Sequence, residues 1–388
     1  MAGKKKIALC LEYPLALRGG VSVLVEILID GLKDRYDLVL VSSDTTENPG
    51  GSSGVTHLPW VPAAVSPATS RHLAEELARA GVHLAHFHFG GNFGWGSRFR
   101  GHCPIPYLNR LGVPAVSTVH SIVHLLNGFC GPQKPLWFKL ALFPVAWTGK
   151  MHVLSHLRRE IAVSHHDVEK LRRWYPPMRG KFLQIYHSRL PAAPAVPVKS
   201  AREPVILNVG HIAWRKGQRV LAGAFAQIAP RHPEWKLRLV GHVAEEDEAN
   251  EIKIIARIHG LQNRILFEDR RENPFDFMST AAIYVQPSYE EALGLALQEA
   301  MFYGCPGIGS KVGGIPELID HQRTGLLVEP GNPSQLAQAI ETLITNPALR
   351  ETYGRQGAAS IIQKGMTADQ MLTSHVQLYE SILKNDRG

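Results

Sequence analysis

The chain has 388 residues, of which 45% are hydrophobic and 20% charged, and its formal net charge is +8. This length suits two domains of ordinary size rather than a single core. The four cysteines are scattered and form no CxxC pair, which argues against a disulfide framework, a structural zinc site or a redox dithiol and favours a reducing cytoplasm. Glu12 and Pro14 interrupt the first apolar run too early for a signal peptide or a membrane span, so a soluble protein is expected.

The positive charge lies in the first half of the chain. Residues 1–200 carry 23 Lys and Arg against 12 Asp and Glu, whereas residues 201–388 carry 19 against 22. A basic N-terminal half indicates an anionic acceptor or an anionic membrane surface as its partner. Nucleic acid is not expected, because no zinc-finger spacing, aromatic RNA-binding strand or arginine-rich tract is present.

Residues 1–190 alternate short apolar runs with amphipathic stretches. Helix-like stretches, with apolar residues three and four apart, occupy 20–34 and 70–80. The strand-like runs are KKIALCL, YDLVLVSS, VHLAHFHF, PAVSTVH and REIAVS. This alternation predicts an α/β domain with a doubly wound parallel sheet covered by helices on both faces.

A Pro- and Ala-rich segment, 191–204, has neither helical nor strand periodicity and is expected to be a linker. The alternation of strands and helices restarts over 205–366, which predicts a second Rossmann-like domain. The last segment, 367–388, has an amphipathic helical pattern and is expected to pack back on the N-terminal domain. Because ligands of such sheets bind beyond the carboxyl ends of the strands, the functional residues should lie in the loops that follow strands.

The segment 287–317 carries the strongest functional pattern. A strand is predicted to end at Ser288 and a helix to begin near Leu293, which places Gly294 and Leu295 at the helix start. The free amides of a helix start can hold a diphosphate. Glu299, nearly two turns into the helix, can accept hydrogen bonds from ribose hydroxyls, and Glu291 in the loop can reach the donor sugar.

Arg215 and Lys216 form the second pattern, in a loop between a predicted strand and a helix that Gly217 opens. An isolated pair of cations is more often a feature of an exposed loop. Its place directly after a strand favours binding of a diphosphate, whose departure develops negative charge that fixed cations stabilise. Such a site requires no metal.

Two weaker signals lie in the N-terminal half. Gly19 and Gly20 follow the first predicted strand, where tandem glycines let the backbone approach a phosphate or a sugar. His120 ends the strand PAVSTVH, where it can bond a sugar hydroxyl or help to move a proton. With 19 histidines in the chain, a structural role for His120 is about as plausible from the sequence.

Over nearly its full length the chain resembles the GT-B glycosyltransferases of the large retaining family four. The resemblance implies two Rossmann-like domains facing across a cleft that closes on substrate, and retention of anomeric configuration. It implies a hexosyltransferase with a nucleotide-diphospho-sugar donor, UDP being the nucleotide favoured, and with a glycan or lipid-linked acceptor in cell-surface polysaccharide or glycoconjugate synthesis. The matching segments are GGVS at 19–22, His120, IAVSHHDVEKL at 161–171, RKG at 215–217, the Glu291 to Glu299 pair, VGGIPELI at 312–319 and GLLVEPGNPSQLAQAI at 325–340.

The resemblance also assigns roles to residues. It implies that Glu299 binds ribose, that Glu291 and His120 contact the donor sugar, that Arg215 and Lys216 hold the diphosphate, and that Gly20 lies where donor and acceptor meet. One departure from the family pattern is His211, which stands where members usually carry a phosphate-binding arginine. Two alternatives stay open: a sugar-nucleotide epimerase of related fold, and a non-catalytic nucleotide-sugar-binding subunit of a polysaccharide assembly complex.

Other patterns are weaker. No two aspartates are separated by one residue, so the metal-chelating DxD motif of other glycosyltransferases is absent and no metal cofactor is expected. The glycines at 307–313 loosely resemble a dinucleotide-binding fingerprint but come late in their domain. The histidines of 83–96 alternate with aromatics on a strand and are interpreted as packing rather than as metal ligands. The segment 134–150, apolar with flanking cations, fits either a buried helix or peripheral contact with the cytoplasmic face of an anionic membrane.

Overall fold

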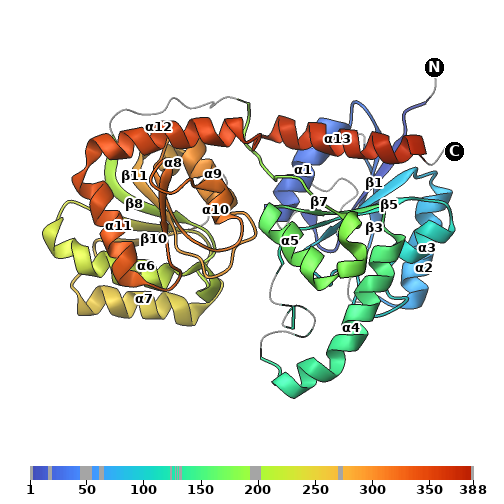
Figure 1. The fold of residues 1–388 in the computed structure, drawn as a ribbon, viewed down its shortest axis with the longest axis horizontal. Helices are drawn as coiled ribbons and strands as arrows, with labels where there is room; N and C mark the ends of the chain where they lie inside the picture. The colour runs from blue at the N-terminus through green and yellow to red at the C-terminus, as the bar shows by residue number, and fades with distance from the viewer. Residues whose placement is uncertain are drawn as a thin grey trace. The chain divides into compact units, whose positions relative to one another are not determined.

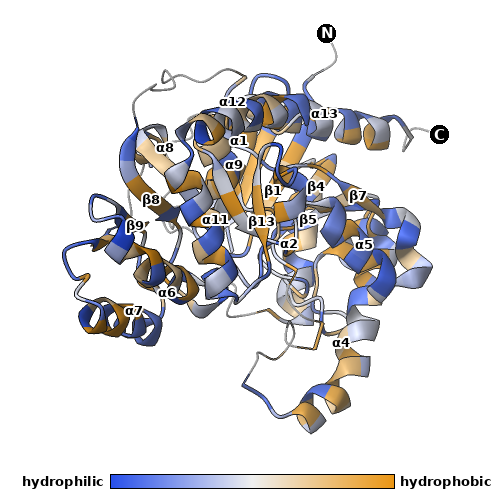
Figure 2. Ribbon diagram, turned by 60° about the vertical axis from the view of Figure 1, so that its left-hand side comes forward, coloured by the Kyte–Doolittle hydropathy of each residue, from blue (hydrophilic) through white to orange (hydrophobic). Residues whose placement is uncertain are grey.

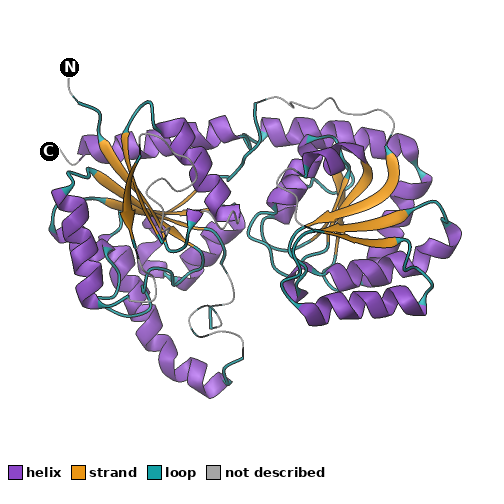
Figure 3. Ribbon diagram, turned by 180° about the vertical axis from the view of Figure 1, so that it is seen from behind, coloured by secondary structure: helices purple, strands orange, loops and turns teal. Residues whose placement is uncertain are grey.

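The computed structural model describes residues 3–15, 20–43, 55–60, 65–122, 125–126, 128, 130, 133–192, 202–269 and 274–385. Its contacts divide the chain into two compact units. Unit 1 comprises Met1–Arg189 with Ala368–Gly388, and unit 2 comprises Leu190–Thr367. Each unit has parallel strands with helices on both sides of the sheet (Figures 1 and 3). The predicted fold class of two doubly wound α/β domains is therefore confirmed.

The sheet of unit 1 has the strand order β3-β2-β1-β4-β5-β6-β7 among the described residues, and every pair is parallel. Its core is formed by the apolar faces of these strands and of the covering helices. The strands are β1 (Lys6–Leu11), β2 (Asp37–Ser42), β3 (Thr56–Pro59), β4 (Leu84–Phe89), β5 (Ala115–Val119), β6 (Arg159–Ala162) and β7 (Phe182–Gln184). The helices are α1 (Gly20–Leu32), α2 (Pro67–Arg79), α3 (Ile105–Arg110), α4 (Leu136–His156), α5 (His165–Trp174) and α13 (Ala368–Asn385).

Local sequence signals begin several of these helices. Ser66 and Thr69 form a capping box at the start of α2, and Pro67 occupies the first helical turn, where no backbone donor is needed. The hydroxyl of Ser164 accepts a hydrogen bond from the amide of Asp167 at the start of α5. The short edge strand β3 was not predicted, because its side chains are largely exposed and lack a continuous apolar run.

The sheet of unit 2 has the order β10-β9-β8-β11-β12-β13 among the described residues, again parallel throughout. The predicted linker is too long by two residues, because β8 already begins at Glu203. The strands are β8 (Glu203–Val209), β9 (Lys236–Val240), β10 (Ile265–Glu268), β11 (Ala281–Gln286), β12 (Gly307–Ser310) and β13 (Gly325–Val328). The helices are α6 (Gln218–Ile228), α7 (Glu246–Ile258), α8 (Phe275–Thr280), α9 (Leu295–Phe302), α10 (Ile315–Leu318), α11 (Pro333–Thr345) and α12 (Pro347–Gln363).

The C-terminal helix α13 packs within unit 1. The hydroxyl of its Tyr379 lies 2.6 Å from Nδ1 of His86 on β4, and its Glu380 pairs with Arg35, which follows α1. Four cysteines, Cys10, Cys103, Cys130 and Cys305, are free thiols. No helix among the described residues combines the length and apolarity needed to cross a bilayer.

Candidate functional site

In each sheet the order of the strands reverses at one place. In open parallel sheets the connections that leave the sheet at such a point run to opposite faces, which makes room for a ligand between them. In unit 2 this point lies between β8 and β11, which are neighbours although 71 residues separate the end of one from the start of the other. The loops concerned are 210–217 and 287–294. These two loops contain Arg215, Lys216, Glu291 and Gly294, so the strand order brings together residues that the sequence keeps far apart.

The backbones of the two loops are bonded to one another. The amide of Tyr289 donates to the carbonyl of Arg215 at 2.8 Å, and the rings of Trp214 and Tyr289 stack with centroids 5.0 Å apart. Gly217, with a φ of +70°, lies so close to the carbonyl of Pro287 that any side chain there would clash. Only glycine meets both requirements, because its backbone adopts positive φ freely and it carries no Cβ.

Glu291 and Lys216 form an ion pair within this crevice. Nζ of Lys216 lies 2.6 Å from Oε2 of Glu291, and the two side chains are 15% and 12% exposed. The same oxygen accepts hydrogen bonds from the amide of Gln286 at 3.1 Å and from the hydroxyl of Ser288 at 3.2 Å. Three donors on one oxygen fix the carboxylate in a single orientation.

The start of α9 differs from the prediction. Strand β11 ends at Gln286 rather than Ser288, and α9 begins at Leu295 rather than near Leu293. Gly294 occupies the cap position with a φ of +98°, which a residue with a side chain adopts only with strain, and this delays the helix start. Glu299 is therefore the fifth residue of α9, just over one turn from the helix start rather than nearly two, and it is 2% exposed.

Arg215 lies in the same loop as Lys216 but is exposed. Its carbonyl receives the amide of Tyr289, and its guanidinium forms no ion pair within the part of the chain that the structure describes. The amides at the start of α9 receive no side-chain cap. The crevice thus combines one cation already paired with Glu291, one free of such a partner, and a helix start without a capping side chain.

The remaining predicted residues belong to unit 1. Gly19 lies outside the described residues, and Gly20 is the exposed first residue of α1. His120 lies one residue beyond β5, and its Nε2 is 3.0 Å from Nδ1 of the buried His88 on β4. In unit 1 the strand order reverses between β1 and β4.

Several residues of these crevices were not predicted. Gln286 and Ser288 hold Glu291, and a polar Gln at the end of the otherwise apolar strand β11 was the available signal. In unit 1, the carboxylate of Glu12 accepts a hydrogen bond from the amide of Trp95, and burial raises its pKa. His86, His88, His120, His187 and His375 form a chain of ring contacts with centroids 4.2 to 6.3 Å apart.

The fold is that of GT-B glycosyltransferases, and comparison with known proteins agrees. The model of the family described as "Glycosyltransferase Family 4" matches residues 18–187, and that described as "Glycosyl transferases group 1" matches residues 192–360. The chain belongs to glycosyltransferase family four and is an enzyme of that class.

The chain is less than one third identical to the individual relatives named here. The chain is 27% identical over 387 residues to an alpha-maltose-1-phosphate synthase of Mycobacterium tuberculosis, covering 91% of this chain and 93% of that protein. It is 28% identical to an N-acetyl-alpha-D-glucosaminyl L-malate synthase of Bacillus anthracis, but over 49% of this chain and 48% of that protein. The chain spans about half the length or less of several curated relatives that it matches.

Solved structures share the fold over the whole chain. A glycosyltransferase from Rickettsia africae has a TM-score of 0.78 at 20% identity and covers 99% of this chain and 100% of its own. The Anabaena protein HepE, solved in complex with UDP-glucose, has a TM-score of 0.71 at 18% identity and covers 97% of this chain and 99% of its own. At these identities the likeness establishes the fold alone.

Proposed function

We propose that this enzyme transfers a sugar from a UDP-sugar to a glycan or lipid-linked acceptor, with retention of configuration and without a metal cofactor. The observation that carries the proposal is the Lys216–Glu291 pair beside the uncapped start of α9, at the point where the order of the unit 2 sheet reverses. Charged groups fixed in such a crevice are suited to an anionic ligand and to the polar sugar attached to it.

Each polar group of the crevice has its own role in binding the donor. The diphosphate lies against the amides following Gly294 and against Arg215 and Lys216. An ammonium group has three donor hydrogens, so Lys216 can bond Glu291 and a phosphate oxygen together. Glu291, held by Gln286 and Ser288, then has its other oxygen for a sugar hydroxyl. Glu299 receives the ribose hydroxyls.

The reaction breaks the bond between the anomeric carbon and the diphosphate oxygen. Negative charge accumulates on the departing oxygen, and Arg215, Lys216 and the α9 amides stabilise this charge more strongly in the transition state than in the bound donor. The acceptor hydroxyl oxygen forms the new bond on the same face, and its proton passes to the departing diphosphate. Neighbours of the same fold bind UDP and UDP-glucose, which favours UDP as the nucleotide.

The function is tested with a panel of UDP-sugars and acceptors. UDP release that requires an acceptor, with a product of retained configuration by NMR and with undiminished rate in EDTA, is the expected result. Isomerisation of a donor in the absence of acceptor would identify an epimerase instead. Donor binding without turnover on any acceptor would identify a binding subunit, and a strict requirement for magnesium or manganese would contradict the metal-free site.

The ribose assignment has its own test. In Glu299→Gln, the loss of the charged acceptor is expected to weaken UDP binding about tenfold or more, since hydrogen bonds to charged groups contribute roughly 1.5–3 kcal/mol each. Glu329→Gln is the matched control, because Glu329 is an exposed carboxylate of the same unit, paired with Lys311. Calorimetric titration with UDP provides the measurement. Equal affinity of both variants would remove Glu299 from the site.

A finer part of the proposal places the enzyme peripherally on the cytoplasmic face of an anionic membrane. The first turns of α4 bear exposed apolar side chains at helical spacing: Leu136 and Trp137 are 62% and 70% exposed, and Leu140, one turn after Leu136, is 55% exposed. Farther along the helix, Leu142, Phe143 and Ala146 belong to a small apolar cluster that includes Phe93. Figure 2 shows this apolar end of α4 extending beyond the strands of unit 1.

The charge around α4 matches an anionic lipid surface. From Leu77 to Arg159 the sequence contains nine Lys and Arg and neither Asp nor Glu, and all of these cations except the buried Lys139 and Lys150 are available to a charged surface. Lys134, just before the helix, lies over the ring of Phe138 at 5.7 Å. Apolar insertion flanked by basic charge is the arrangement that binds anionic bilayers, and Trp favours the bilayer interface.

Vesicle sedimentation tests whether this surface of α4 binds membranes and other exposed apolar residues do not. Leu136→Ser/Trp137→Ser is expected to lower binding to vesicles containing phosphatidylglycerol by at least about tenfold, because burying one large apolar side chain contributes roughly 1.5–3 kcal/mol. Ile254→Ser/Ile258→Ser on α7, where both residues are similarly exposed, is the control and should bind like the parent. Concentration-dependent dimerisation lost in the α4 variant, with unchanged vesicle binding, would assign this surface to a second copy of the chain.

A further inference from the structure

One face of the unit 1 sheet carries a row of polar residues. Strands β4 and β5 pair in parallel with His86 opposite Val116 and His88 opposite Thr118. Since side chains alternate between the two faces of a strand, His86, His88, Thr118 and His120 point to the same face. Tyr379 and His375, four residues apart on α13, lie against this face and contact the ring of His86.

His88 cannot reorient within this face. It is 1% exposed, and its ring packs on that of His86 with centroids 4.2 Å apart. His86 is itself bonded at both nitrogens, to the Tyr379 hydroxyl at 2.6 Å and to the Thr118 hydroxyl at 2.8 Å. The backbone of His120 is held as well, because its amide donates to the carbonyl of Phe89 at 3.0 Å.

The single hydrogen bond between His88 and His120 involves two uncharged rings. The pKa of both side chains is lowered well below 6.5. Burial is the main cause, and the neighbouring histidines add to it. Each neutral imidazole therefore has one N–H, and either Nδ1 of His88 donates to Nε2 of His120 or the reverse holds. Nε2 of His88 is buried and has no hydrogen-bond partner among the described residues.

This unpartnered atom decides the direction of the bond. If His88 were protonated on Nε2, a buried N–H would have no acceptor, which is rarer in proteins than an unpaired acceptor atom. Protonation on Nδ1 makes His88 the donor and His120 Nε2 the acceptor. His120 then has its proton on Nδ1, for which the described residues supply no bond.

We propose that His88 is a positioning residue that holds His120 as an Nδ1–H donor, so that His120 binds a sugar oxygen and does not act as a general base. The inference rests on the proposed function for the identity of the ligand. Of the two roles expected for His120, bonding a sugar and accepting a proton, only the first remains. The lone pair of the His120 ring that would accept a proton already accepts the hydrogen bond from His88. It also agrees with transfer of the acceptor proton to the departing diphosphate.

The tautomer is measured directly on the ligand-free protein. Long-range nitrogen–proton NMR spectra distinguish Nδ1–H from Nε2–H histidines, and comparison with His120→Asn assigns the signal. The expected pattern for His120 is Nδ1–H at neutral pH. An Nε2–H pattern would overturn the inference whatever the enzyme transfers, and this result does not depend on finding the correct donor or acceptor.

Kinetics of His88 variants test the positioning role. His88→Leu removes the donor and is expected to lower kcat/KM for the sugar donor by roughly tenfold, the usual effect of one neutral hydrogen bond, with UDP affinity unchanged. In His88→Asn the amide nitrogen lies near the original Nδ1 and should restore most of the loss. His375→Leu, which removes a buried histidine not bonded to His120, is the control. Equal losses in the Leu and Asn variants, with both folded by circular dichroism, would contradict the inference.

Discussion

In unit 2 the loops after β8 and β11 meet through a charged pair, Lys216 and Glu291. In unit 1, by contrast, strand β4 carries His86 and His88, whose pKa values burial lowers well below 6.5. Both sheets follow the same reversal of strand order. The difference teaches that the fold sets where a ligand can bind, while the loops and strand ends set which chemistry meets it. We therefore expect changes of charge to alter mainly the stability of unit 1 and mainly the catalytic rate in unit 2.

The largest effect is expected from a deeply buried ion pair of unit 1. Lys150 on α4 and Glu160 on β6 lie 2.7 Å apart with both side chains fully buried, and Ser117 donates to the same carboxylate oxygen. Lys150→Met leaves that carboxylate without its counter-charge and should cost about 3–5 kcal/mol of unfolding free energy. Urea titration followed by circular dichroism provides the measurement.

A second variant shows whether the cost comes from the unpaired charge. Lys150→Met/Glu160→Leu removes both charges and should recover most of the lost stability, because apolar replacement of a buried pair is often neutral. A double variant as unstable as the single one would instead attribute the effect to packing, for example to the contact of Lys150 with the Phe89 ring.

Removing Lys216, the cation of the unit 2 crevice that pairs with Glu291, should lower the catalytic rate rather than the stability of the fold. Lys216→Met is expected to reduce kcat by about 10²–10³, as loss of one group stabilising transition-state charge does. Glu291 keeps its bonds from Gln286 and Ser288, so the melting temperature should change little. Lys311→Met, which removes an exposed lysine of the same unit, should leave kcat unchanged. A normal kcat in Lys216→Met would remove this lysine from the reaction.

Acid should destabilise unit 1 through its histidines. Burial lowers the pKa of His375 from 6.5 to about 4, so the unfolded chain binds a proton below pH 6.5 that the folded chain does not. Stability is therefore lost as the pH falls from 6.5 to about 4, by roughly 3 kcal/mol for this residue at 1.36 kcal/mol per pKa unit. Urea midpoints should fall less over this range in His375→Leu than in the parent. If the urea midpoints of the parent and of His375→Leu fell equally with pH, His375 would not be buried in its neutral form.

The sequence predicted the class of fold and the loops of the unit 2 crevice, because apolar periodicity and glycines at strand ends are local signals. It could not show that Lys216 bonds Glu291, since that contact depends on β8 and β11 being neighbours. The histidines of β4 were interpreted as packing, and their contacts with α13 bring together residues nearly 300 positions apart. The start of α9 was misplaced because the conformation of Gly294 is set by its surroundings, not by helical periodicity.

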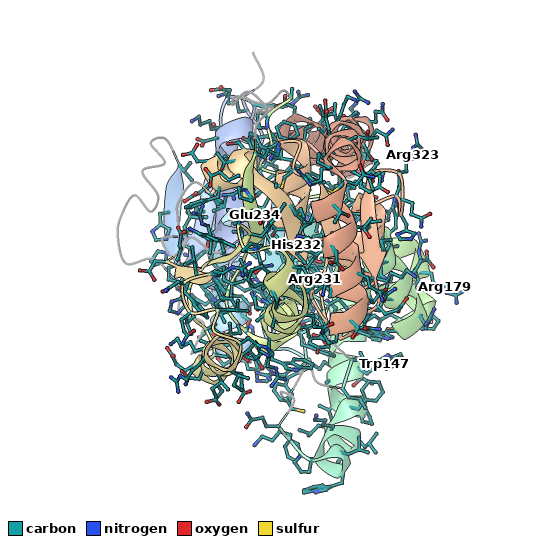
Figure 4. All side chains as sticks on the ribbon, turned by 90° about the vertical axis from the view of Figure 1, so that its left-hand side faces the viewer. Trp147, Arg179, Arg231, His232, Glu234 and Arg323 are labelled. Carbon is teal, nitrogen blue, oxygen red and sulfur yellow. The ribbon has the colours of Figure 1, made fainter. Side chains whose placement is uncertain are left out.

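The smallest effect is expected from an ion pair on the surface of unit 2. The guanidinium of Arg231 bonds both carboxylate oxygens of Glu341, at 2.7 and 2.9 Å, and His232 contacts the same carboxylate. Arg231 and His232 are labelled in Figure 4. Water screens this pair because Arg231 is 57% exposed, so Arg231→Ala should shift the melting temperature far less than Lys150→Met. The shift should also vanish in about 1 M salt, where the screening length is about 3 Å, whereas that of Lys150→Met should persist. Equal shifts for the two variants would mean that burial does not distinguish the charges of the two units.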